Sequence, residues 1–182
     1  MKFIKLPFAG NVFIIELETH EDHRGLFART VCADEFRSIG LNSNFIQQSI
    51  SFNPKKGTLR GMHWQTLPFG EEKLVRVTRG SIFDVVVDIN PKSKTFKKSF
   101  SVELSQENRK QIYISEGYAH GFQTLESDTE VHYEMTCNYR PEASRGFIWN
   151  DPSVGISWPI RENLIMSQTD LGFSNLDDSI LK

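Results

Sequence analysis

Residues 57–88 read GTLRGMHWQTLPFGEEKLVRVTRGSIFDVVVD, and this stretch decides the fold. Its alternating and β-branched runs, separated by a Pro/Gly loop and an Arg-Gly turn, predict strands at residues 58–64, 73–77 and 82–88. Charged or polar side chains interrupt these apolar runs at Arg60, His63, Lys73 and Asp84. A buried charge is costly unless it has a partner or a function. We therefore expect adjacent strands of one sheet that carry a polar pocket inside a β-barrel.

The rest of the chain has the same character. Further strands are expected at residues 12–18, 26–31, 44–52, 96–104, 111–114, 119–125 and 130–137. One helix is expected at residues 33–39, where Gly40 stands in the stop position. Turn signals at this spacing are typical of an all-β sandwich or jelly roll. We predict one all-β domain over residues 1–182, with a few short helices and a tail, residues 148–182, that packs across the barrel mouth.

Composition excludes several classes of protein. The net charge is −2 and no basic run occurs, so a nucleic-acid partner is not expected. The apolar runs are too short to cross a bilayer, and the N-terminus lacks the cleavage site of a signal peptide. Cys32 and Cys137 match neither a zinc spacing nor a disulfide framework. These features lead us to expect a cytoplasmic protein with two free thiols.

The polar pocket has an unusual inventory, since His120 and Tyr133 join Arg60, His63 and Lys73 from later strands. A metal site would need several converging His or carboxylate ligands, yet Gln65 stands two residues after His63 and a lysine ammonium would repel a cation. No Gly-x-Ser-x-Gly elbow occurs, and neither cysteine has a basic neighbour. We therefore expect no metal, no cofactor and no Ser or Cys nucleophile.

What remains suits proton transfer on an anionic carbonyl compound. A neutral imidazole can remove a proton from carbon beside a ketone, and a lysine can stabilise the enolate that forms. A phenol can return a proton from the opposite face, while an arginine binds a phosphate. This inventory predicts an epimerase that inverts a carbon next to a ketone.

Several collinear motifs carry a resemblance to a known family. They are TLRGMH at 58–63, KLVRVTRG at 73–80, FDVVVD at 83–88, GYAHGF at 117–122 and WNDP at 149–152. On these motifs the chain resembles the dTDP-4-dehydrorhamnose 3,5-epimerases, a family of cupins, from residue 22 to residue 170. The resemblance implies a cupin-type jelly-roll barrel without a metal. It also implies a homodimer whose N-terminal strands cross to the partner, and a nucleotide-diphosphate sugar as substrate.

The resemblance assigns roles to single residues. It implies that His63 is the general base, that Asp170 holds and polarises it, that Tyr133 donates the second proton and that Lys73 steadies the enolate. The substrate-binding residues that we expect on this basis are Arg24, Phe27, Arg29, Gln47, Ser49, Arg60, His120 and Asn138. Of these, Arg24 and Phe27 would reach the nucleotide across the dimer. The pairing of Asp170 with His63 rests on the resemblance alone.

The departures from the family pattern cluster at positions that read the nucleotide. Arg29 and Ser144 replace usual glutamates, Ser49 an asparagine, Asn138 a base-stacking tyrosine and Thr169 a lysine. An arginine only donates hydrogen bonds, so Arg29 cannot accept the hydrogen bonds that a glutamate at this position would accept. Loss of an aromatic face would remove a stacking contribution of about 1–3 kcal/mol. We therefore hypothesise that the chemistry is retained and that the carrier nucleotide or the sugar differs.

Two other functions remain open. A 3,4-ketoisomerase of the same fold would also pass through an enolate but would relocate the ketone. A sugar-nucleotide-binding cupin without catalysis would need none of the three groups His63, Tyr133 and Asp170 together. The leading hypothesis is an epimerase of a nucleotide-activated 4-keto-6-deoxyhexose, which inverts C3, C5 or both.

Overall fold

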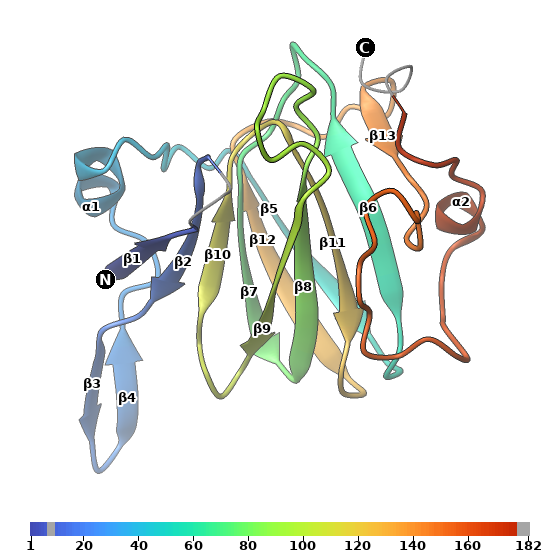
Figure 1. The fold of residues 1–182 in the computed structure, drawn as a ribbon. Helices are drawn as coiled ribbons and strands as arrows, with labels where there is room; N and C mark the ends of the chain where they lie inside the picture. Colours follow the sequence, from blue (N-terminus) through green and yellow to red (C-terminus); the bar gives the residue numbers. More distant parts are fainter. Residues whose placement is uncertain (7–9, 178–182) are drawn as a thin grey trace.

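A computed structural model describes residues 1–6 and 10–177 of the chain, in which two antiparallel sheets face each other (Figure 1). The six-stranded sheet has the order β1 (Lys2–Lys5), β2 (Val12–Glu16), β10 (Gln111–Ile114), β7 (Lys73–Arg79), β12 (Thr129–Met135), β5 (Gln47–Asn53). The five-stranded sheet has the order β13 (Ser144–Gly146), β6 (Leu59–Gln65), β11 (Tyr118–Thr124), β8 (Ser81–Asp88), β9 (Ser99–Ser105). The all-β, cupin-type jelly roll expected from the sequence is confirmed.

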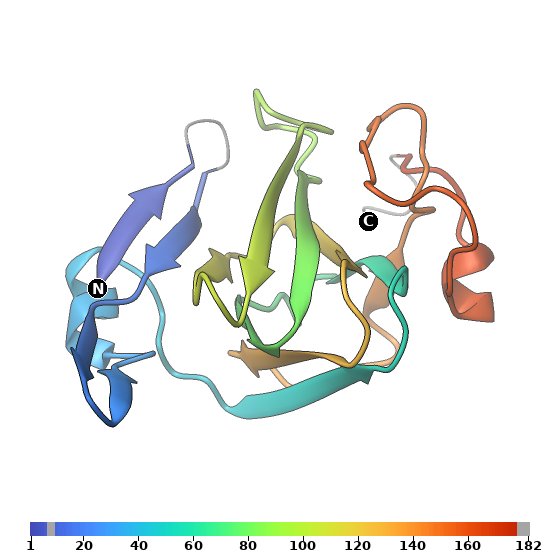
Figure 2. The same cartoon turned by 90° about the horizontal axis from the view of Figure 1, so that it is seen from below.

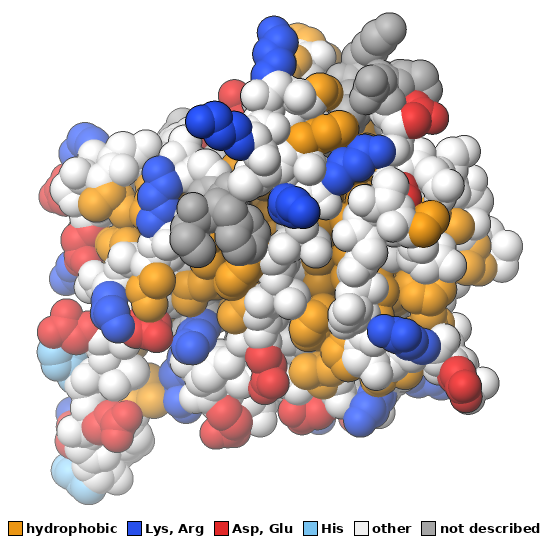
Figure 3. All heavy atoms as spheres, viewed as in Figure 1, with side chains coloured by type: hydrophobic (Ala, Val, Ile, Leu, Met, Phe, Trp, Pro, Cys, Tyr) orange, Lys and Arg blue, Asp and Glu red, His pale blue; other side chains and the backbone are white. Residues whose placement is uncertain are grey.

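Three further elements lie outside the two sheets. The hairpin of β3 (Thr19–Asp22) and β4 (Gly25–Ala28) stands away from the barrel, with charged and histidine side chains over its surface (Figures 1 and 3). The helix α1 (Ala33–Ser38) lies on the same side, and α2 (Gln168–Leu171) lies beyond β6 (Figure 1). In the described ranges neither helix has the length and apolar content that a bilayer span requires.

The apolar side chains form three layers because each strand alternates between its two faces. The layer between the sheets contains Val75, Val77, Val86, Leu104, Ile112, Ile114, Phe122 and Val131. A second layer lies outside the six-stranded sheet, where Phe36 of α1 packs edge-on against Tyr113 with ring centroids 5.9 Å apart. The third lies outside the five-stranded sheet, where Val85 and Val87 contact residues of the C-terminal tail.

The tail lies mainly against the outer face of the five-stranded sheet, and its residues Asp170 and Phe173 border the space between the sheets. Trp158 and Leu176 are buried among the outward side chains of β6, β8 and β11, and Figure 2 shows the tail on the side of the barrel opposite α1. Burial of these large apolar groups against the sheet explains the position, since each fully buried side chain contributes about 1.5–3 kcal/mol. The last residues of the expected tail, 178–182, fall outside the described part of the chain.

Two other expectations about the strands are corrected. Arg60, His63 and Asp84 do come from one sheet, but Lys73 begins β7 in the facing sheet. The pocket is therefore made between the sheets and not on one of them. The strand β3 lies where no strand was expected, because its residues are all exposed and so lack the apolar alternation that identifies a strand.

Candidate active site

A break in the pairing of β6 with β11 places Arg60 and His63 on the same side of their sheet. His63 pairs with His120 and Arg60 with Phe122, so three steps on β6 match two on β11. In a regular strand residues three apart face opposite sides, and a β-bulge adds the residue that corrects this. Gly61 occupies the irregular position with a φ of +113°, and a Cβ there would lie 2.7 Å from the Cα of Gly121. Glycine is thus required where β6, which carries His63, closely approaches β11, which carries His120.

The tail brings Asp170 to His63. Ile165 pairs in parallel with Thr58, and the same five-residue step along both segments leads to Asp170 and His63. Asp170 Oδ1 lies 2.8 Å from His63 Nε2, and Asp170 Oδ2 accepts the backbone N–H of Gly61 at 3.3 Å. Burial alone would raise the pKa of Asp170, but the hydrogen bond and positive charge of His63 outweigh it and the pKa is lowered. The carboxylate is therefore ionised and orients the imidazole.

Two adjoining hollows, each of about 450 Å³, open between the sheets. The Arg60 hollow is lined by Arg60, His120, Ser167 and Asp170, and the Tyr139 hollow by Gln47, Glu71, Tyr139, Thr169 and Phe173. Both are lined by Ser49, His63, Lys73 and Tyr133. The histidine and the phenol thus border one continuous space, from β6 on one sheet and β12 on the other.

The phenol of Tyr133 is held in its protonated form. Burial, followed by the negative charge of Asp84, raises the pKa of Tyr133, and the positive charge of Arg60 opposes them only in part. The ring of Tyr133 meets that of His120 edge-on, with centroids 6.1 Å apart. His120 Nε2 in turn lies 2.7 Å from Asp84 Oδ2, and both side chains are buried. Asp84 therefore fixes His120, which helps to fix Tyr133.

Lys73 carries a partner that sequence reasoning missed. Its Nζ lies 2.9 Å from Glu71 Oε1, and both side chains are almost buried, with 13% and 12% of their surface exposed. Residues two apart on an extended segment share a face, which explains the pairing. Across residues 1–6 and 10–177, no group of three or more His, Cys, Asp or Glu side chains gathers as a metal site would need.

The aromatic side chain on the rim is Tyr139 and not residue 138. Tyr139 is 59% exposed and lines the Tyr139 hollow, whereas Asn138 lines neither hollow and accepts a hydrogen bond from Gln65 through its backbone carbonyl at 3.3 Å. Gln47 Oε1 accepts the backbone N–H of Tyr139 at 2.9 Å. An aromatic face is therefore present at the rim, one position after Asn138. An aromatic residue directly after Asn138 was the signal that the sequence offered.

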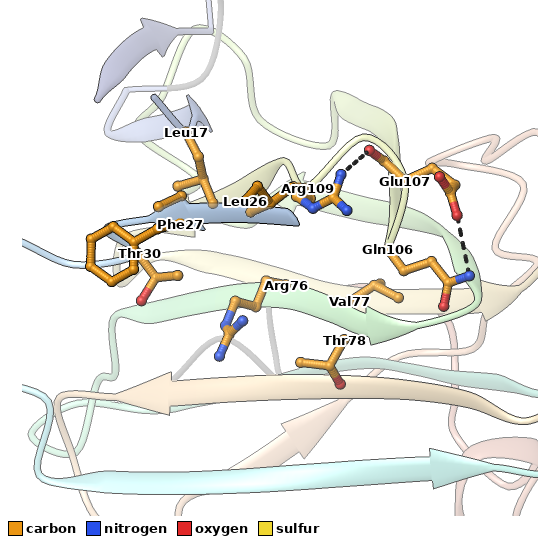
Figure 4. Close-up of a pocket in the computed structure, with 11 residues that line it drawn as sticks. Leu17, Leu26, Phe27, Thr30, Arg76, Val77, Thr78, Gln106, Glu107 and Arg109 are labelled. Atoms are coloured by element: carbon orange, nitrogen blue, oxygen red, sulfur yellow. Dashed lines mark hydrogen bonds between the residues drawn. The ribbon is translucent and has the colours of Figure 1, made fainter. Parts of the chain in front are cut away.

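Three expected nucleotide-binding residues lie away from both hollows in the single chain. Arg24 pairs with Asp22 at 2.5 Å on the hairpin, and Arg29 pairs with Glu35 of α1 at 3.2 Å. Phe27 is 74% exposed and borders a different hollow of about 540 Å³, between the hairpin and β7 (Figure 4). Arg76, Thr78 and Arg109 line its other side (Figure 4). One protomer alone therefore does not bring Arg24, Phe27 and Arg29 to His63.

A cupin-type barrel with a carboxylate-held histidine and a protonated tyrosine around one cavity has the equipment of a carbohydrate epimerase, an isomerase. Comparison with known proteins identifies the group. Residues 7–178 match the dTDP-4-dehydrorhamnose 3,5-epimerase family, and the chain belongs to it.

Individual relatives agree over almost the full length. The dTDP-4-dehydrorhamnose 3,5-epimerase of Methanothermobacter thermautotrophicus is 41% identical over 98% of this chain and 96% of its own. The crystal structure of that enzyme from Elizabethkingia anophelis superimposes with a TM-score of 0.94 at 35% identity, covering 99% and 98% of the two chains. The epimerase of Legionella pneumophila, solved in complex with dTDP-4-keto-L-rhamnose, gives a TM-score of 0.90 at 35% identity over 96% and 92%.

Proposed function

We propose that the protein epimerises a thymidine-diphosphate-linked 4-keto-6-deoxyhexose at C3 and C5. The observation that carries the proposal is the pairing of Asp170 with His63 at 2.8 Å, beside a cavity that Tyr133 also lines. Binding alone would not need a base, a base-orienting carboxylate and a protonated phenol around one space. The related Legionella enzyme in complex with dTDP-4-keto-L-rhamnose supports the substrate class.

His63 starts the reaction. Asp170 occupies Nε2, so the other ring nitrogen is the one free to accept a proton. It takes the proton from carbon 3 or 5 of the sugar, the electrons of the C–H bond form a C=C bond, and the ketone oxygen becomes an enolate. Lys73 is the cation that stabilises this oxygen, and Glu71 holds its ammonium until the charge develops.

Tyr133 completes the inversion. Its raised pKa keeps the proton on the phenol at neutral pH, ready for transfer to the carbon from the face opposite His63. The C=C electrons then take that proton and the ketone reforms. Solvent returns a proton to the tyrosinate and removes one from His63, so the enzyme is restored without an oxidant or reductant.

Arg60 and His120 are assigned to the diphosphate and the sugar because both line the Arg60 hollow. Gln47, Ser49 and Tyr139 are assigned to the nucleoside because they line the Tyr139 hollow. The aromatic ring of Tyr139 offers a face on which a base can stack, and the thymidine carrier is proposed from the related enzyme solved with dTDP-4-keto-L-rhamnose. Titration of the purified protein with TDP, CDP, UDP and GDP tests this assignment. Clear preference for a nucleotide other than TDP would restore the hypothesis of a changed carrier.

A homodimer completes the site. The outer face of β5 exposes Ile50 and Phe52, with 64% and 48% of their surface accessible, which is a contiguous apolar strip on a sheet. Beside it, Arg76 Nε and His132 Nδ1 are buried and have no hydrogen-bond partner among the residues that the structure describes. A second copy on this face would cover these groups, and its projecting hairpin would supply Arg24 and Phe27.

A cytoplasmic location is consistent with the two free thiols, Cys32 and Cys137.

Deuterium incorporation is the direct test. Incubation of the 4-keto-6-deoxyhexose nucleotide with the enzyme in heavy water should place deuterium at C3 and C5, with inverted configuration, by NMR of the product. Absence of deuterium above the buffer control would refute the proposal. Deuterium with a ketone moved to C3 would identify the ketoisomerase instead.

A further inference from the structure

Asn53, the last residue of β5, has an amide whose orientation is fixed. Its side chain is fully buried, with 0% exposure. Asn53 Nδ2 donates to the backbone carbonyls of Ser51 at 3.0 Å and of Thr129 at 3.2 Å. A carbonyl oxygen can only accept, so a rotated amide would set oxygen against oxygen at both contacts. The carbonyl end of the Asn53 side chain therefore has to face the other way.

The carbonyl oxygen of the Asn53 side chain faces Arg60. Arg60 Nε donates to Asn53 Oδ1 at 2.9 Å, across the segment that joins β5 to β6. A guanidinium is planar, so a hydrogen bond at Nε sets the direction of its plane and leaves the N–H groups of both terminal nitrogens for a ligand. Because Arg60 lines the Arg60 hollow beside Tyr133, this plane meets the space between His63 and the phenol.

We propose that Asn53 is a positioning residue that orients Arg60 for the diphosphate of the substrate. This inference rests on the proposed function and adds a residue that does not itself contact the substrate. Arginine carries one of the largest side-chain entropies, and an oriented guanidinium loses less of it on binding. The buried amide donates through Nδ2 to backbone carbonyls of β5 and β12 and accepts from Arg60 through Oδ1, so it supplies that orientation before the nucleotide arrives.

A purely structural role is the competing explanation, because the bonds of Asn53 to Ser51 and Thr129 also join two strands. The two roles differ in what depends on Arg60. If Asn53 acts through Arg60, its replacement has no effect on nucleotide binding once the guanidinium is gone. If Asn53 only joins the strands, its effect on binding is the same with or without Arg60.

A double-mutant cycle with thymidine diphosphate separates them. Asn53→Leu should weaken TDP binding about tenfold in calorimetry, as expected for a lost hydrogen bond to a charged group. Arg60→Met should weaken it further, and the double variant should equal Arg60→Met. With sugar substrate, Asn53→Leu should raise KM and leave kcat within about twofold, since the proton-transfer groups are untouched. The inference would be overturned if the affinity losses of the two single variants multiplied in the double variant. It would also be overturned if Asn53→Leu bound TDP as tightly as wild type.

Thr129→Val is the matched control. It removes a hydrogen bond from Thr129 Oγ1 to the carbonyl of Glu126 at the same strand end but does not alter the Asn53–Arg60 contact. It should lower the melting temperature and leave TDP affinity unchanged. A loss of affinity as large as that of Asn53→Leu would assign the effect to strand ends in general and reject the positioning role.

A measurement on the wild type covers the case in which Asn53→Leu does not fold. In protein with ¹⁵N-labelled arginine, the Arg60 Nε–H should exchange with water more slowly than those of exposed arginines. Exchange at the rate of an exposed arginine would contradict the fixed orientation. If the wild type turns over the sugar nucleotide but the binding free energies in the cycle are additive, this inference alone is rejected. If the wild type binds no TDP, the proposed function is rejected as well.

Discussion

His63 and Asp170 form the contact on which the proposed chemistry depends. Because the carboxylate is ionised and bonded to Nε2, it selects the tautomer whose other nitrogen is basic, and it stabilises the imidazolium that follows proton removal. An amide in its place can hold the ring but carries no charge.

Asp170→Asn should therefore lower kcat by about 10²- to 10³-fold, within the range of a lost acid–base contribution. TDP affinity should change little, because the substitution keeps the shape of a side chain whose oxygens bond His63 and the backbone of Gly61. Steady-state kinetics and calorimetry measure the two effects. An equal fall in kcat and in TDP affinity would mean that Asp170 mainly shapes the binding cavity.

Tyr133→Phe separates proton removal from inversion. The variant keeps His63, so deuterium from heavy water should still enter the sugar, returned by His63 to the face from which the proton left. Product of inverted configuration should form at least about 10²-fold more slowly. NMR of the recovered sugar nucleotide measures both the deuterium content and the configuration at each carbon. His63→Ala is the control and should abolish deuterium entry, and a Tyr133→Phe variant that inverts at the wild-type rate would remove Tyr133 from the mechanism.

Part of this site could be predicted from residues alone. Arg60, His63, Lys73, His120 and Tyr133 interrupt apolar strand patterns, and the cost of burying polar groups marks such positions. Asp170 could not be found this way, since it lies 107 positions after His63 and no local pattern encodes that contact. That Tyr139 and not Asn138 borders the cavity could not be predicted, because the segment after β12 has no periodicity to fix which residue faces it.

Among the elements, β6 departs most from what its sequence predicts. Strict alternation would put Arg60 and His63 on opposite faces, and the irregular pairing with β11 at Gly61 is what brings them together. Strand existence was readable from the apolar runs, but a bulge depends on the partner strand. The parallel pairing of the tail with β6 is equally invisible in the sequence.

Gly61→Ala should destabilise the protein by about 2–4 kcal/mol, because backbone strain at positive φ adds to a clash with the backbone of Gly121 and His120. Gly117→Ala is the matched control, since Gly117 also has a positive φ but nothing within 4 Å of an added Cβ. Gly117→Ala should lower the free energy of unfolding only by the backbone strain at positive φ, about 1–2 kcal/mol. Urea unfolding measures both, and equal losses would show that the close approach of β6 and β11 is not tight.

The outer face of β12 carries a pH-sensitive group. Burial and then the charge of Arg76 on β7 lower the pKa of His132, against a smaller opposite effect of Glu130. A lowered pKa means that the unfolded chain binds this proton more readily, so stability falls as the pH drops below the ordinary histidine value of about 6.5. His132→Gln should lose less stability than wild type between pH 7.5 and pH 5 in thermal melts. Parallel curves for the two proteins would contradict the assignment.

At the scale of the whole molecule, the parts of the site are divided. The barrel carries the proposed proton-transfer groups, while Arg24 and Phe27 stand on a hairpin that projects from the side remote from α2 (Figure 1). The sequence predicted one barrel with a polar interior, because both follow from alternation within strands. It could not predict where the hairpin would lie, since β3 and β4 bury almost nothing against their own barrel.

The proposed dimer can be broken from Phe52, which lies on the outer face of β5 and borders neither hollow of the candidate site. Phe52→Asp places a charge where 48% of the phenylalanine is exposed, so the fold of the protomer should survive. A charge without a partner in a buried interface is strongly unfavourable, and analytical ultracentrifugation should therefore find a monomer. TDP affinity should fall with it, because Arg24 and Phe27 of the second copy are lost, while His63 and Tyr133 stay in place. Ile165→Asp, on the tail that covers the other sheet, should remain dimeric. A monomeric Phe52→Asp that still binds TDP as tightly as wild type would mean that each chain builds its nucleotide site alone.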